Sequence, residues 1–211
     1  MVTFALLSRT PLASQASLVP IAAAIELQLN RDFAPVWSPL KSYVVTADQD
    51  AEARLALSSE PSCVVTLVDA EYQPGDAGWH SAVGADPYAT IQVQDCGDDL
   101  AAVISHECLE TAADWRADLW MPAPHGPDFA LEVCDPVAEL RVEVAGLRLS
   151  AFVGPGWFDG CGPPDSPVLP GCLSPRGYVL RRDGSTMWGG AMPDRKLPAW
   201  GRAARRLEAV R

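Results

Sequence analysis

Lysine and arginine are missing from a long internal stretch of this 211-residue chain. No Lys or Arg occurs from Leu55 to Trp115, and Arg116 is the only such residue between Leu55 and Leu140. The same stretch contains sixteen Asp and Glu residues, whereas the whole chain has a net charge of −11, so the remainder is net positive. Surface helices normally mix acidic with basic side chains. The missing cations therefore exclude an ordinary solvated surface here and indicate clustered carboxylates.

Long apolar runs are also missing. The segment Leu18–Leu29 is too short to span a bilayer and contains Glu26. The first residues, Met1–Leu7, contain no basic residue and are too few for a signal peptide, so we read them as a strand. We therefore expect a cytoplasmic protein without a signal peptide or a membrane partner, or one that leaves the cell as part of a larger particle.

Cysteines occur without any CxxC pair. The chain has six cysteines, which could form three disulfides in an oxidising compartment, although nothing indicates export. Cys161 and Cys172 flank a proline-rich loop and are the first pair to test for a disulfide. Cys108 and Cys134 flank the acidic site in sequence. Either could be a thiolate ligand, but we expect both to be buried structural thiols.

The composition is that of a globular α+β protein. Hydrophobic residues make up 48% of the chain and charged residues 20%, which suffices for one good core. The chain has 19 prolines and 16 glycines, and they cluster after Met121. This clustering predicts a domain over residues 1–140 and a loop-rich extension with β-hairpins over 141–211, packed on it.

Hydrophobic periodicity predicts the elements of the first domain. Strands are expected at Val2–Leu7, Ser42–Thr46 and Cys63–Asp69, and an amphipathic backing helix at about Ser17–Asp32. Apolar and polar residues alternate over Tyr88–Gln94, which favours an edge strand with one covered face. A helix that carries the acidic motif follows directly.

The second half of the chain predicts hairpins and a basic tail. Glu139–Leu149 and Tyr178–Met187 alternate around turns at Ala145-Gly146 and Asp183-Gly184. The tail Asp194–Arg211 is rich in arginine and is expected to form a solvated terminal helix, although it could also touch nucleic acid or an acidic neighbour. No sequence-specific nucleic-acid binding is expected, because aromatic residues do not interleave the basic ones.

The acidic motif begins with His106 on the predicted helix. Asp98 and Asp99 are candidate N-caps. At 3.6 residues per turn, His106, Glu110 and Asp114 share one face, and Glu107 lies about a quarter-turn away.

Clustered carboxylates raise one another's pKa unless a cation neutralises them, and a divalent metal does this with good geometry. Two ligands four residues apart on a helix can reach one ion, which is the physical basis of the HExxH zinc motif. Glu110 stands where that motif has its second histidine. Zinc is therefore expected, with manganese, iron or calcium as alternatives because a carboxylate is a harder ligand than imidazole.

The string His106-Glu107-x-x-Glu110-x-x-x-Asp114, followed by Glu132-x-Cys134-Asp135-Pro136, resembles a zincin-like group of bacterial and phage proteins. This group is related to the gluzincin metallopeptidases, and exordium-type proteins carry a similar HExxE arrangement. The resemblance implies a mixed β-sheet with a backing helix and a metal-site helix, in which an edge strand borders the substrate cleft. It also implies roles for individual residues: His106, Glu110 and Glu132 as metal ligands, Glu107 as general base, Asp135 as a supporting partner, and Asp114 as a further ligand or a loop-fixing residue.

Two further histidines are ambiguous. His80 is a candidate ligand or, beside Glu107, a catalytic transition-state donor, but an ordinary half-buried loop histidine is the plainer interpretation. His125, in Pro-His-Gly-Pro, is expected to be exposed.

Two functional classes follow from these observations. The first is a peptidase-like metallohydrolase with a peptide or protein substrate and a metal-activated water. The second is a phage virion component of the capsid or tail, bound to neighbouring subunits, that keeps a zincin-like scaffold with a structural ion or none. A fold alone does not decide between them.

Overall fold

The computed structural model describes most of the N-terminal two thirds of the chain and short parts of the remainder. The described residues are 1–37, 40–47, 61–69, 77–122, 128–158, 177–180, 182–183, 185–188 and 195–196.

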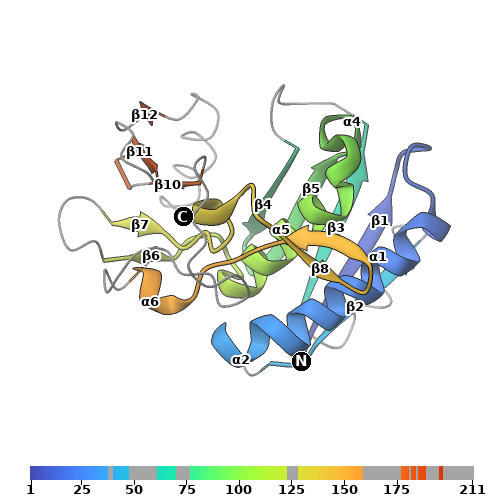
Figure 1. Cartoon of the computed structure of the whole chain (residues 1–211), viewed down its shortest axis with the longest axis horizontal. Helices are drawn as coiled ribbons and strands as arrows, with labels where there is room; N and C mark the ends of the chain where they lie inside the picture. Colours follow the sequence, from blue (N-terminus) through green and yellow to red (C-terminus); the bar gives the residue numbers. More distant parts are fainter. Residues whose placement is uncertain are drawn as a thin grey trace.

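A five-stranded sheet forms the centre of the fold (Figure 1). Its strands are β1 (Val2–Ser8), β2 (Ser42–Ala47), β3 (Ser62–Val68), β4 (Gly78–Val83) and β5 (Asp86–Gln92), in the order β2-β1-β3-β5-β4. All neighbours are parallel except β4, which pairs antiparallel with β5. The edge strand next to β5 is therefore β4, at the opposite edge from β2.

Two long helices pack on one face of this sheet (Figure 1). They are α1 (Gln15–Gln28) and α5 (Leu100–Ala113). Alternate residues of β1 and β3, such as Phe4 and Val65, are fully buried in the same cluster as Ile25 of α1 and Leu109 of α5. This shared apolar core fixes α5 relative to the sheet.

Shorter elements connect and extend these helices. A π-helical turn, Leu29–Phe33, and α2 (Ala34–Trp37) continue α1. Between β5 and α5 lie α4 (Val93–Cys96) and a 3₁₀ turn, Gly97–Asp99. The remaining described elements are β6 (Trp120–Met121), β7 (Phe129–Ala130), the 3₁₀ turn η3 (Asp135–Val137), β8 (Arg141–Val144), β9 (Leu147–Ser150), α6 (Pro155–Phe158), β10 (Tyr178–Leu180), β11 (Ser185–Trp188) and β12 (Arg195–Lys196).

A buried polar network ties α1, α5 and β9 together. Ser105 Oγ donates to Gln28 Oε1 at 3.1 Å and accepts from the Ser150 N–H at 3.0 Å. Gln28 Nε2 donates to the Ser150 carbonyl at 2.7 Å. All three residues are 0% exposed, so each hydrogen bond replaces a lost contact with water. The network fixes the position of α5 at the residue preceding His106.

The structure confirms the α+β class, with a mostly parallel sheet and two main helices. The strands expected at Val2–Leu7, Ser42–Thr46 and Cys63–Asp69 are present within a residue or two, and the helix expected at Ser17–Asp32 corresponds to α1 with its π-helical continuation.

The hairpins are also confirmed. β8 and β9 pair antiparallel around Ala145 and Gly146, which both have positive φ as a tight two-residue turn requires. β10 and β11 pair antiparallel across the expected second turn.

The expected edge position of Tyr88–Gln94 is wrong. β5 ends at Gln92 and has neighbours on both sides, because the preceding segment Gly78–Val83 folds back as β4. The two strands join through a turn at Gly84, whose φ is +67°. A glycine adopts this conformation without steric cost.

Some expectations fall outside the described residues. The Cys161–Cys172 pair, His125 and most of the tail Asp194–Arg211 are among them, although Arg195–Lys196 forms β12 and pairs with β11. The cysteines that are described, Cys63, Cys96, Cys108 and Cys134, are free and buried, as expected of structural thiols. Among the described helices, none combines the length and the apolarity needed to cross a membrane.

Candidate metal centre

Helix α5 supplies the first part of a buried polar site. Glu107 and Glu110 are each 4% exposed, and the His106 side chain is 20% exposed. His106 and Glu110 lie one turn apart, with His106 Nε2 at 3.2 Å from Glu110 Oε2. The helix ends at Asp114, whose backbone N–H donates to the Glu110 carbonyl. The expected stacking of His106 and Glu110 is therefore present.

Strand β4 supplies His80. Residues 78 and 80 point to the same side of the strand because side chains alternate along it. A Cβ built on Gly78 would meet Glu107 Oε1 and Val103 Cγ1, so this side faces α5. The His80 imidazole is 4% exposed and lies opposite Ala89 in the β4–β5 register. His80 is thus a strand residue with a buried side chain in the site, not a loop residue.

The segment that follows β7 supplies Glu132 and Asp135, which are 2% and 7% exposed. Backbone hydrogen bonds from Leu131 N–H to the Leu119 carbonyl and from Val153 N–H to the Val133 carbonyl hold it. The Cys134 N–H donates to Glu110 Oε1 at 3.2 Å, which joins this segment directly to α5.

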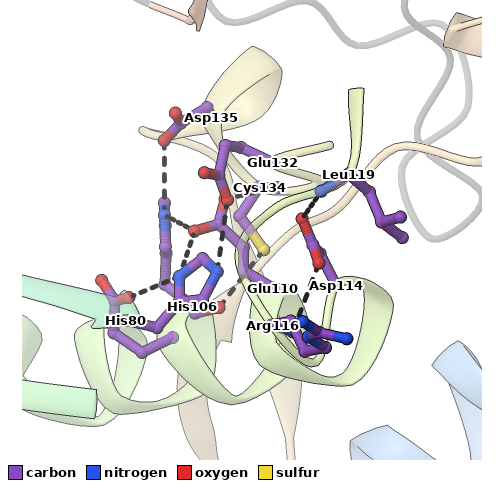
Figure 2. A network of polar contacts seen from close by, with 10 residues as sticks. His80, His106, Glu110, Asp114, Arg116, Leu119, Glu132, Cys134 and Asp135 are labelled. Carbon is purple, nitrogen blue, oxygen red and sulfur yellow. Dashed lines mark hydrogen bonds and ion pairs between the residues drawn. The ribbon is translucent and has the colours of Figure 1, made fainter. Parts of the chain in front are cut away.

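His80 lies between carboxylates from two other segments (Figure 2). Its Nδ1 is 3.4 Å from Glu107 Oε2 and 3.6 Å from Glu110 Oε2. Its Nε2 is 3.6 Å from Glu132 Oε2. One imidazole therefore has acidic oxygens at both ring nitrogens, an arrangement that a neutral histidine with a single N–H cannot satisfy at both.

His106 also lies beside two carboxylates, one of which it shares with His80. Its Nε2 lies 3.2 Å from Glu110 Oε2 and 3.4 Å from Asp135 Oδ1, as Figure 2 shows. Glu110 Oε2 is thus a neighbour of both histidines. The carboxylates of the site come from α5 and from the segment after β7, and Glu110 contacts both imidazoles.

The electrostatics reflect this crowding. Burial alone would lower the pKa of His106, but the charges of Glu110 and nearby acids raise it well above the usual value. Burial would raise the pKa of Glu110, yet the charge of His106 lowers it. Burial and then the Glu110 charge raise the pKa of Asp135 to about 7, against hydrogen bonds from His106 and Tyr178. Without a bound cation, protons thus neutralise part of the site.

The residues fit a divalent metal ion. Two sets of three side chains each bring one ligand atom within 4.8 Å of the others: His80 with Glu110 and Glu132, and His106 with Glu110 and Asp135. Imidazole and carboxylate are the donors that zinc, manganese and iron accept. Glu107 Oε2 is buried and has no hydrogen-bond partner in the described part of the chain, which adds an unsatisfied acceptor beside His80.

The ligands expected from the sequence fall into two different sets. Glu132 groups with His80, whereas His106 groups with Asp135; Glu110 belongs to both. Asp114 lies in neither set, since its carboxylate accepts from the backbone N–H groups of Arg116 and Leu119 at 3.3 and 2.8 Å. Asp114 therefore fixes the loop that follows α5.

The thiol of Cys134 is a structural neighbour of the site. Its Sγ lies 3.8 Å from the His106 carbonyl. Burial, as the largest effect, raises the pKa of this thiol well above its usual value, and Cys134 belongs to neither ligand set.

Tyr178 was not anticipated as part of this region. It begins β10, which packs on η3, and its side chain forms a hydrogen bond with Asp135. Gly177 makes this approach possible, because a Cβ there would lie 1.8 Å from the Pro136 carbonyl oxygen. The glycine directly before a strand residue was the available signal in the sequence.

The chain matches no protein-family model. No curated protein and no solved structure matches it significantly either. Any function must therefore be argued from the site itself.

Proposed function

We propose that this protein is a metal-dependent hydrolase of the peptidase type, with its centre at the histidines and carboxylates of α5, β4 and the segment after β7. The observation that carries the proposal is the grouping of His80, His106, Glu110, Glu132 and Asp135 beside the unsatisfied Glu107 Oε2. Buried ionisable groups gathered in this way are typical of functional sites.

The donor set suits a Lewis acid, and a divalent ion bound there would lower the pKa of a water molecule and polarise a carbonyl. Glu110 is the central ligand, with His106 and Glu132 as the further ligands expected from the sequence. His80, already a candidate ligand from the sequence, is supported as a fourth ligand because it shares a set with Glu110 and Glu132.

Glu107 is the candidate general base. Its Oε2 lies 3.4 Å from His80 Nδ1 and is free to accept a proton, because no described residue donates a hydrogen bond to it. The His80 imidazole, facing Glu107 on one side and Glu132 on the other, can hold or pass on that proton.

The edge position of β4 supports a peptide substrate. Among the described strands, β4 has only β5 as a neighbour, so its second edge carries backbone groups without strand partners. An extended peptide can pair with such an edge, and His80 would lie next to it in β4. A peptide bound there would present its carbonyl groups beside Glu107 and the ligands.

The order of elements supports a zincin-like arrangement. A strand, a backing helix, further strands, an edge strand and then the site helix is the order expected of a minimal zincin. β1, α1, β2 and β3 come in this order and α5 follows as the site helix, although β5 lies between the edge strand β4 and α5.

Metal analysis combined with a peptidase assay tests the proposal. Purified protein loaded with Zn²⁺ is assayed on a quenched-fluorescence peptide library beside a Glu107→Gln variant. We expect bound metal in both proteins and at least about a 100-fold loss of activity in the variant, which is the usual contribution of a general base. Glu143→Gln, the same substitution at an exposed position of β8, is the matched control and should retain activity.

Bound metal with no activity, or with activity that Glu107→Gln leaves unchanged, would contradict the hydrolase. It would favour the alternative of a phage virion component that keeps a structural ion. Absence of bound metal would contradict the metal centre as well.

A further inference from the structure

We propose that the site holds two divalent ions, bridged by the Glu110 carboxylate. This inference rests on the metal centre of the proposed function and deepens it, because that function requires only one ion. One ion belongs to His80, Glu110 and Glu132, and the other to His106, Glu110 and Asp135.

The first observation is that the two candidate ligand sets have only Glu110 in common. Each contains one histidine and two carboxylates, and in each set the ligand atoms lie within 4.8 Å of one another. Three protein ligands with a position left for water or substrate is the usual composition of a catalytic zinc site. Each set is thus sufficient for an ion of its own.

The second observation is the position of Glu110 between the histidines. Its Oε2 is 3.2 Å from His106 Nε2 and 3.6 Å from His80 Nδ1. The Cys134 N–H holds the other oxygen, Oε1, at 3.2 Å. A carboxylate fixed in this way can serve an ion on either side without rotating, which is what a bridging ligand requires.

The third observation is the charge of the buried cluster. Glu107, Glu110, Glu132 and Asp135 are all less than 9% exposed and would together carry four negative charges when ionised. One divalent ion offsets two of these charges, whereas two ions neutralise all four. The unsatisfied Glu107 Oε2 is an independent sign of missing positive charge, since it is buried and has no hydrogen-bond donor among the described residues.

The ligands come from three chain segments. The two segments other than α5 bring His80 and Asp135 to Glu110. His80 approaches from β4, and Asp135 from η3 after the loop that carries Glu132. Figure 2 shows His80 and Asp135 at different parts of the network, connected through His106 and Glu110. This places the two sets side by side, with the shared carboxylate between them.

Metal stoichiometry tests this inference. Chelator-treated full-length protein is equilibrated with excess Zn²⁺, desalted and measured for zinc per chain by mass spectrometry. We expect two ions in the wild type and one in each of His80→Gln and Asp135→Asn, because each substitution removes a ligand from one set only. Glu110→Gln should retain fewer than one. Asp118→Asn, at a half-exposed loop position, is the control for surface binding and should keep two.

A second readout distinguishes a bridged pair from two unrelated ions. Mn²⁺-loaded wild type should give the EPR spectrum of an exchange-coupled pair, and Asp135→Asn that of an isolated ion. Circular dichroism shows whether each variant is folded. Where a variant does not fold, the number of ions bound to the wild type alone tests for a second ion.

The outcomes separate this inference from the proposed function. A wild type that saturates at one ion overturns the bridged pair and leaves the metallohydrolase intact. No bound ion overturns both. Two ions that persist in both His80→Gln and Asp135→Asn, or an uncoupled manganese spectrum in the wild type, overturn the assignment to these ligand sets.

Discussion

Gly78 of β4 faces Glu107 of α5 so closely that a Cβ on Gly78 would lie 3.0 Å from Glu107 Oε1. The same Cβ would lie 3.0 Å from Val103 Cγ1 and 3.1 Å from Ile91 Cδ1. The absent side chain thus lets the edge strand approach the helix at the candidate general base. Strand and helix can close on the site because position 78 has no Cβ.

Gly78→Ala should disturb Glu107. We expect a loss of about 1–3 kcal/mol in the free energy of unfolding, because the added methyl group overpacks the interface between β4 and α5. Chemical denaturation measures the loss, and the peptidase assay should show a lower rate with little change in bound metal. Gly84→Ala is the control. The φ of Gly84 is +67°, and apart from its chain neighbours no atom of the described chain would lie within 4 Å of an added Cβ. This variant should therefore lose stability without affecting the site. Equal rates in the two variants would contradict a role for the close approach.

Metal binding should release protons at neutral pH. Without metal, the pKa of His106 lies well above its usual value and that of Asp135 is about 7, so at pH 7 the first is protonated and the second partly so. A metal ion needs both groups deprotonated, and its affinity should therefore rise as the pH rises from 6 to 8. Titration calorimetry in two buffers of different ionisation enthalpy measures the released protons. Asp135→Asn should release fewer, and a heat that is independent of the buffer would contradict the prediction.

Ser105→Ala should destabilise the fold without removing metal ligands. The substitution leaves Gln28 Oε1 and the Ser150 N–H without their buried partner. We expect a loss of about 1–3 kcal/mol in the free energy of unfolding, measured with urea. Ser17→Ala, at an exposed position in the first turn of α1, should change stability by less than about 0.5 kcal/mol. Zinc per chain should stay at the wild-type value, and a loss of zinc would show that the network also positions the ligands.

Gly177→Ala should displace β10 from the site. The added Cβ would overlap the Pro136 carbonyl oxygen. This oxygen belongs to the backbone, which cannot move aside as easily as the end of a flexible side chain. Hydrogen exchange of the β10 amides should become faster, and the hydrogen bond between Tyr178 and Asp135 should be lost. Gly146→Ala tests the specificity of the effect: its φ is +79° and the space around it is open among the described residues, so only the β8–β9 turn should respond. Unchanged exchange in β10 would contradict the close packing.

The sequence predicted the elements whose residues follow a clear apolar pattern. β1 and β3 were visible as short apolar runs, and α1 was visible as a helical repeat of apolar residues. β4 was missed because Gly78-Trp79-His80-Ser81 has no such pattern and only one neighbouring strand to cover it. The turn glycine Gly84, directly before the alternating residues of β5, was the signal that could have revealed a hairpin.

Residue spacing predicted the part of the site that lies on one helix, whereas Glu132 and Asp135 were expected only from the resemblance. The spacing of His106, Glu107 and Glu110 fixes their directions once the helix is accepted. Grouping Glu132 with His80 depends on how the segment after β7 packs against the sheet edge, and no local pattern encodes that contact. Asp114 shows the same limit, because its spacing fits the helix face but the helix ends there and its carboxylate turns to the following loop.

The centre draws its side chains from positions as far apart in sequence as His80 and Asp135, so it is complete only after β4, α5 and η3 have all docked. Contacts of this span form late on a folding pathway, because the loops between them must close first. If the proposed ion binds there, it would bind after these elements have docked and would stabilise the folded molecule. It should leave the refolding rate nearly unchanged and slow unfolding, so that metal occupancy would set the lifetime of the native state.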